Sequence, residues 1–295
     1  MTVDLATTSN PIVDEALARC GDIATLPEVT AKIIELVEDH NSSARQMHEV
    51  IKTDPALSAR MLKVVNSAFY GLPGQIASVD RAIVLLGLSA VKNIAIAASV
   101  SRMFKGQEIG GGFTAKDLWK HSVAVAVSGR LIAKIIGFTG AADEVFLAGL
   151  IHNLGILVAR QAFPEKLKEV VERCMAAGGG FLELQNEIIG ADHQAFGAAL
   201  TQKWKFPRGL RAVVGHHLDP EKLAPELRDF GTIIHLAVIL CCKEKIGFYL
   251  SADGAELTDE LLEHVQLQRG QIDELLEELD DNIAAAEATL ATGGG

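Results

Sequence analysis

Histidine is the residue type in this chain that could do chemistry, and it recurs on apolar sequence. His152 and Asn153 are the only polar side chains of residues 146–158, FLAGLIHNLGILV, a stretch without charge. A helix that is apolar all round lies inside a protein, where an imidazole and an amide need hydrogen-bond partners. Further histidines lie on apolar sequence on either side: His121, His193, His216 and His217. We therefore expect a shared, buried polar site.

Such a histidine cluster can serve two purposes. The rings can hydrogen-bond one another and Asn153 in a metal-free polar core. Alternatively, they can hold one transition ion, zinc, iron or nickel, since these ions accept nitrogen ligands. His193, His216 and His217 alone would offer three imidazoles. The sequence leaves both alternatives open, and neither requires a cofactor for activity.

Helices must position these histidines, because the sequence shows helix caps and helical periodicity but no alternating strand pattern. Thr114 and Asp117 form a capping-box pattern that opens a long helix with His121 on its apolar stripe. Asn10-Pro11 and Asp54-Pro55 read as a cap followed by proline at the first helical position. Hydrophobic residues make up 49% of the chain and aromatic residues only 5%, so Leu, Ile, Val and Ala must form the core. The predicted fold class is all-α.

Glycine-rich and acidic segments predict how the helices are divided. Four glycines between 106 and 112 indicate a linker, so we expect an N-terminal lobe over 1–105, a linker over 106–113 and a second lobe over 114–250. Residues 251–295 are predicted to form two amphipathic helices, about 258–268 and 271–291, and a disordered end at Gly293–Gly295. The apolar stripes of this tail could pack on their own body, form a homodimer, or dock on a partner.

The charge of the chain is concentrated in the tail. Net charge is −11, and twelve of the 38 acidic residues but only one of the 27 basic residues follow Leu250. The first 250 residues thus carry 26 of each sign, and a neutral body with an acidic tail argues against nucleic acid as a partner.

Other features predict a cytoplasmic protein that makes no membrane contact. The N-terminus has no basic region followed by an apolar one, and charged residues interrupt every apolar run that approaches the ~18 residues of a membrane span. The four cysteines, Cys20, Cys174, Cys241 and Cys242, have no metal or redox spacing, which is typical of reduced core residues.

Several segments together resemble a known family. They are LPEVTAKIIEL, IKTDPALSARMLKVVNSAFYG and ASVDRAIVLLG in the first lobe, then KHS, GLIHNLGIL, GADHQAFGAALTQKWKFP and VVGHHLDP in the second. Over about residues 20–240 the chain resembles the HDOD family (HD-related output domain) of bacterial signalling proteins. The resemblance implies two helical lobes, with a degenerate HD-superfamily core in the second. It also implies regulation through contacts with signalling proteins, without established catalysis.

The related HD superfamily of metal-dependent phosphohydrolases shows what this sequence has lost. Those enzymes use an adjacent His-Asp pair whose carboxylate bridges metals, and here the pair is His152-Asn153. A lysine that follows the pair in the HD-GYP group corresponds to Ile156, and the aspartate that closes the site corresponds to Val238. By position, the five histidines match metal ligands of the HD-GYP pattern. Because a neutral amide cannot bridge two cations, we expect no enzyme activity.

Two alternatives to a non-catalytic module stay open. One is a metal-dependent phosphohydrolase with a remodelled site, and the other is a sensor that binds a small ligand or metal between the lobes. The cleft of such a sensor would lie where Asn66 and Tyr70 meet the second lobe. Because residues 1–250 are neutral and contain the complete family pattern, the sequence also predicts that a chain ending near Leu250 folds by itself.

Overall fold

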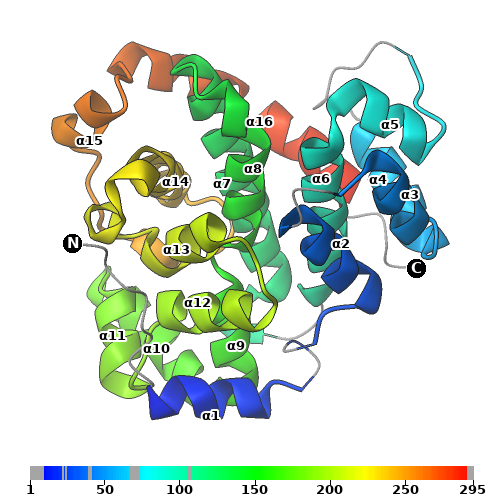
Figure 1. Ribbon diagram of the computed structural model, residues 1–295. Helices are drawn as coiled ribbons and strands as arrows, with labels where there is room; N and C mark the ends of the chain where they lie inside the picture. Colours follow the sequence, from blue (N-terminus) through cyan, green and yellow to red (C-terminus); the bar gives the residue numbers. More distant parts are fainter. Residues whose placement is uncertain are drawn as a thin grey trace.

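The computed structural model describes residues 10–21, 23, 25–38, 42–66, 74–104 and 108–290, except for the side chains of 37, 38 and 288–290. The described chain is all-α apart from one short hairpin (Figure 1). Its first helices are α1 (Pro11–Arg19), α2 (Glu28–Glu38), α3 (Ala44–Ile51), α4 (Pro55–Val65), α5 (Val79–Leu86) and α6 (Leu88–Val100). The second lobe contains α7 (Ala115–Ile135), α8 (Ala142–Ile151), α9 (Leu154–Ala162), α10 (Pro164–Ala177), α11 (Phe181–Ile188), α12 (His193–Lys203), α13 (Arg208–His216) and α14 (Pro225–Lys243). The tail forms α15 (Asp259–His264) and α16 (Arg269–Leu290).

The helices begin where the side-chain caps predict. Asn10 Oδ1 accepts a hydrogen bond from the Ile12 amide at 3.0 Å, with Pro11 at the first helical position. Asp54 Oδ1 accepts from the Leu57 amide at 2.8 Å before Pro55. These bonds satisfy amides that the first helical turn leaves without intrahelical partners.

Helix α1 does not belong to the N-terminal lobe, although the sequence places it there. It packs against α9 and α12 of the second lobe, and Figure 1 shows it below α12, away from α2–α5. Arg19 Nη1 donates to the Ala162 carbonyl at 3.1 Å, and Cys20 Sγ lies 3.5 Å from the Val158 carbonyl. The N-terminal lobe therefore begins after α1, because the apolar face of this helix is covered by α9 and α12.

The predicted glycine-rich linker is in part a small hairpin. Strand β1 (Glu108–Gly110) pairs antiparallel with β2 (Phe113–Thr114), and β1 packs on α10. Gly111 has φ +57°, and a Cβ there would overlap Met175 and lie 2.9 Å from Val171. The glycines thus permit close packing and a left-handed turn rather than separation of two lobes. Gly106 and Gln107 lie outside the described residues.

The tail packs on its own body and connects both lobes. Helix α16 contacts α7 of the second lobe and α4 of the first, behind the other helices in Figure 1. Its apolar stripe is buried, together with that of α15: Leu262, Val265, Leu267, Ile272, Leu275, Leu279, Ile283 and Ala286. A homodimer through this stripe would have to displace these intramolecular contacts. Gly293–Gly295, where we expect disorder, lie outside the described residues.

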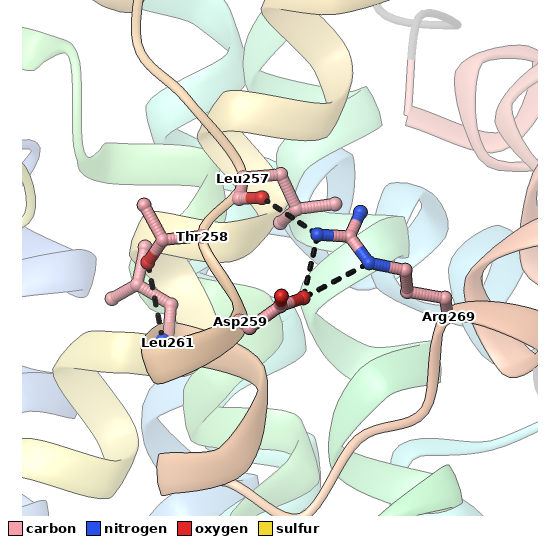
Figure 2. Close-up of polar contacts among 5 residues, drawn as sticks. All are labelled: Leu257, Thr258, Asp259, Leu261 and Arg269. Carbon is pink, nitrogen blue, oxygen red and sulfur yellow. Dashed lines mark hydrogen bonds and ion pairs between the residues drawn. The ribbon is translucent and has the colours of Figure 1, made fainter.

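Arg269, the one Lys or Arg residue that follows Leu250, holds the turn between α15 and α16 in place. Figure 2 shows Arg269 reaching back to Asp259, whose Oδ1 accepts from Nε at 3.0 Å and from Nη2 at 2.6 Å. Arg269 also donates to the Leu257 carbonyl at 3.3 Å, while Thr258 Oγ1 caps α15 by accepting from the Leu261 amide. This geometry directs α16 across the two lobes.

One described stretch, Thr139–Ala162, has the length and composition of a membrane span, with a mean hydropathy of 1.5. Glu144 and Arg160 bound its longest uncharged run, residues 145–159, which is shorter than the ~18 residues of a membrane span. Of its most apolar 18-residue window, 83% is buried inside the protein, and His152 and Asn153 separate α8 from α9 within the stretch. It forms the centre of the second lobe, as its apolar character on all sides predicts.

Candidate functional site: a buried histidine cluster

Four of the five predicted histidines converge in the second lobe; we call them the histidine cluster. His121 lies in α7, His152 follows α8, His193 begins α12 and His217 follows α13. Their ring centroids form a chain, with 5.5 Å from His121 to His152, 5.0 Å from His152 to His217 and 5.3 Å from His217 to His193. All four side chains are fully buried. Three of these rings lie at helix ends, which brings them together from different segments.

One nitrogen of every ring in the histidine cluster is held by a fixed acceptor. Nδ1 of His121, His152 and His217 contacts the carbonyls of Ile246, Gly149 and Val214 at 3.1, 2.6 and 2.9 Å, respectively. His193 Nδ1 contacts Gln185 Oε1 at 2.6 Å. Carbonyl and amide oxygens only accept, so we assign the proton of each neutral ring to Nδ1. Each Nε2 is then left with a lone pair.

Several of these lone pairs have no partner. Nε2 of His152, His193 and His217 is buried and forms no hydrogen bond, and the same is true of both side-chain atoms of Asn153. His121 Nε2 lies 3.5 Å from Ser251 Oγ. Buried polar atoms are usually hydrogen-bonded, and leaving one unpaired costs about 1–3 kcal/mol. The cluster is therefore a place where a small polar species would be stabilised.

Burial keeps the rings neutral. Desolvation lowers the pKa of His121 to about 4 and that of His193 to about 3. It also holds the pKa values of His152 and His217 well below 6.5, and the neighbouring rings lower them further. A charged imidazolium would lose its hydration in this core, and at His217 the nearby Asp192 carboxylate raises the pKa by less than burial lowers it. At neutral pH the cluster therefore carries no charge.

These pKa shifts predict that the protein loses stability in mild acid. An unfolded chain binds protons on its histidines below pH 6.5, whereas the folded cluster does not until pH falls to about 4. Stability is thus unaffected above pH 6.5 and falls below it. At pH 5, His121 and His193 should each cost about 2 kcal/mol, with His152 and His217 shifting in the same direction.

Urea unfolding at pH 7 and pH 5 checks this expectation. The free energy of unfolding should drop by at least about 4 kcal/mol in the wild type. The drop should be smaller in His121→Gln, which removes one of the buried rings. Equal stability of the wild type at both pH values would show that the cluster rings titrate normally.

His216 does not join the histidine cluster, which corrects the predicted set. His216 is half-buried and, together with Lys222, lines two surface pockets. In the described part of the chain, its ring makes no contact with the four rings of the histidine cluster. The reason is helical geometry, since neighbouring residues on a helix point about 100° apart. His217 turns inward at the end of α13, so His216 cannot.

The other predicted positions take structural roles. Ile156 and Val238 are fully buried apolar side chains of α9 and α14. Asn66 caps α4, where its amide donates to the Leu62 and Ile76 carbonyls and its Oδ1 accepts from the Ile76 amide at 2.6 Å. It does not line the cavity beside the histidines, and Tyr70 lies outside the described residues. The proposed cleft at these two residues gains no support.

A cavity of about 560 Å³ adjoins the cluster instead. Three of its lining residues touch the histidines: Ser251 Oγ contacts His121 Nε2, the Phe181 ring lies 5.8 Å from that of His193, and His235 Nδ1 contacts the His217 carbonyl at 2.9 Å. Sequence reasoning missed these residues and Gln185. Their positions relative to the cluster depend on tertiary contacts, so no local pattern could have revealed them.

The chain is similar in sequence to a known family of proteins. The sequence profile of the HDOD domain matches residues 23–220, about two thirds of the chain. The chain belongs to the HDOD family. A relative from Treponema pallidum of uncharacterized function is 25% identical over 225 residues, which cover 76% of this HDOD chain but 43% of the relative. The chain thus spans less than half the length of that protein.

Solved structures share the HDOD fold. A HDOD domain protein with unknown function from Geobacter sulfurreducens is 20% identical, with a TM-score of 0.76 over 95% of this chain and 97% of that one. A proposed phosphohydrolase from Shewanella amazonensis SB2B is 22% identical, with a TM-score of 0.72 over 95% and 98%. A proposed signal transduction protein from Marinobacter aquaeolei VT8 is 23% identical, with a TM-score of 0.76 over 96% and 65%.

The residues of this HDOD chain do not fit the two-metal centre of HD phosphohydrolases. Asn153 replaces the bridging carboxylate, and the Asp117 carboxylate is used at the start of α7, where its Oδ2 accepts from the Thr114 amide and hydroxyl. Neutral imidazoles cannot offset the repulsion between two adjacent dications. Among the described residues, no three His, Cys, Asp or Glu side chains form a ready metal site. A single zinc, iron or nickel ion held by unpaired Nε2 atoms therefore stays a proposal, which elemental analysis after dialysis would decide.

Proposed function

We propose that this HDOD chain is a non-catalytic signalling module that acts through protein contacts. The observation that carries the proposal is the neutral character of the histidine cluster. The two-metal hydrolysis of HD enzymes needs a carboxylate that bridges the metals, and the amide of Asn153 cannot supply it. The family and the signalling name of the Marinobacter protein support a role in signalling. The rival reading is a metal-dependent phosphohydrolase with a remodelled site.

The first test is a hydrolysis assay. We expect the purified full chain to show no turnover of cyclic dinucleotides or phosphomonoesters with zinc, manganese or magnesium, because no described carboxylate contacts the cluster. The comparison is the same protein after metal removal, together with His152→Ala. Turnover that needs metal and disappears in His152→Ala would establish the phosphohydrolase reading and end this proposal.

Exposed apolar residues on the N-terminal lobe support the proposal that the chain binds a protein partner. On α5, Val84 is 82% exposed and Leu85 is 46% exposed. Large apolar side chains that lie side by side at the surface are typical of interaction sites. Helix α5 lies at the outer edge of the first lobe, on the opposite side of the molecule from α12 and α13 in Figure 1. A partner could therefore bind it without entering the second lobe.

Affinity capture from the source cell tests this surface. The full chain should retain a signalling protein that is lost when Val84→Glu is the bait, because a buried carboxylate without a partner is costly. Met175→Glu is the matched control, since Met175 is an exposed apolar residue of α10 in the other lobe. Equal capture by all three baits would exclude α5 as the contact.

A further inference from the structure

A groove on the second lobe has the properties of a separate binding site. Helix α12 forms its floor, with α1 on one side and α13 on the other, as their order in Figure 1 indicates. We call it the α12 groove. Its volume is about 630 Å³, within the roughly 300–1,000 Å³ of small-molecule pockets. A smaller pocket of about 180 Å³ continues it, and the two share Ala212, His216 and Lys222.

Small side chains create the α12 groove. Ala195, Ala198 and Ala199 lie on one face of α12, and Ala212 and Gly215 face them from α13. At Gly215 a Cβ would lie 3.1 Å from Ala198 Cβ, so the two helices approach closely here. Longer side chains of the same two helices line the groove around this contact: Gln194, Gln202, Lys203 and Arg211. The floor is thus apolar and suits the body of an organic molecule.

An arginine whose Nε has no hydrogen-bond partner gives the α12 groove a cationic contact. Arg211 lines the groove, and its Nε is buried without a hydrogen-bond partner. No ion pair of Arg211 occurs within the described parts of the chain. Lys203 and Lys222 lie at the rim, and Lys222 contacts Asp219 at 2.8 Å. A guanidinium binds carboxylate and phosphate groups through paired hydrogen bonds, which makes Arg211 the anchor for an anion.

The position of the carboxylates around the groove decides whether Arg211 is already neutralised. Asp192 caps α12, with Oδ1 accepting from the Ala195 amide at 2.9 Å and Oδ2 from Asn186 Nδ2 at 3.0 Å. Asp14 lies on the α1 side, and Glu226 lies in the smaller pocket. Asp192 and Glu226 form no ion pair with Arg211 in the described structure, and Arg211 Nε has no hydrogen-bond partner there.

We propose that the α12 groove binds a small organic anion, with a phosphate or carboxylate head on Arg211 and an apolar body on the alanine floor. The site is distinct from the histidine cluster, and the proposal does not depend on whether the chain is catalytic. Of the five histidines singled out in the sequence, His216 belongs to this groove. Its half-buried ring lies where the two pockets meet and offers a further polar contact to the head group.

Isothermal titration of the full chain tests this site with four probes. Adenosine monophosphate carries a phosphate head and a flat body, and octanoate carries a carboxylate head and an alkyl body. Adenosine and inorganic phosphate each lack one half. We expect one of the first two probes to bind with a Kd below about 1 mM, and adenosine and inorganic phosphate to bind at least about tenfold more weakly, because head and body contribute together.

Two variants locate the binding. Arg211→Gln should weaken it at least about tenfold, since a hydrogen bond to a charged group is lost. Ala199→Leu should weaken it by narrowing the floor. Arg45→Gln, an exposed arginine of α3 outside the groove, should bind as the wild type does. Thermal melts confirm that each variant folds. Failure of both the phosphate and the carboxylate probe to bind, or full binding by Arg211→Gln, overturns the proposal.

Discussion

Replacing Gly155 by alanine should prevent the second lobe from folding. Gly155 follows the His152-Asn153 pair in α9, where this helix packs backbone to backbone on α12. A Cβ at this position would overlap the His193 carbonyl oxygen and lie 2.7 Å from the Gly197 nitrogen. Neither atom belongs to a flexible side chain, so α9 and α12 would have to separate. That separation would also displace His193 from the histidine cluster.

The expected cost of this single methyl group is more than about 4 kcal/mol, at the upper end of the range for point substitutions. Purified Gly155→Ala should lack a cooperative thermal transition by circular dichroism. Gly140→Ala is the matched control, because no atom lies within 4 Å of its Cβ position and its φ is not positive. A melting temperature for Gly155→Ala within a few degrees of Gly140→Ala would show that the helices are not in such close contact.

Removing the tail after Leu250 should abolish cooperative unfolding of the remaining chain. The sequence alone predicts the opposite, since residues 1–250 are neutral and contain the family pattern. The structure changes this expectation because α16 lies against α7 and α4 and buries a continuous apolar stripe. Each fully buried aliphatic side chain contributes roughly 1.5–3 kcal/mol, and domains are stable by only about 5–15 kcal/mol. Truncation would also expose the faces of α7 and α4 that the tail covers.

Circular dichroism melts and light scattering of the full and truncated chains measure this effect. Leu279→Asp, which places a charge on the buried stripe, should reproduce part of the loss in the full-length chain. Asp280→Asn alters the next residue on the exposed face and should change little. If the truncated chain melts cooperatively at a similar temperature, the tail is an accessory segment, and its stripe is available for a second copy or a partner.

Local features of the sequence were sufficient for the fold class and the main helices. Caps such as Asn10, Asp54 and Thr114 predict where helices begin, because they satisfy amides only a few residues away. The absence of alternating strand patterns predicts the all-α fold, and the segments from LPEVTAKIIEL to VVGHHLDP lead to the HDOD family. The apolar stretch around His152 also predicts the buried centre of the second lobe. Each of these properties depends on residues that are close together in the chain.

Tertiary structure decided which residues form the site and which surfaces are covered. His217 joins the histidine cluster and His216 faces the α12 groove, a division that depends on how α13 packs. The Nδ1 partner of His121 is the carbonyl of Ile246, which is 125 residues away in the sequence. Helix α1 packs on the second lobe, and α16 packs on both lobes. Their apolar stripes alone do not show which of these surfaces each helix covers. A stripe predicts only that a face is buried, whereas the surface that buries it is selected by packing across the whole chain.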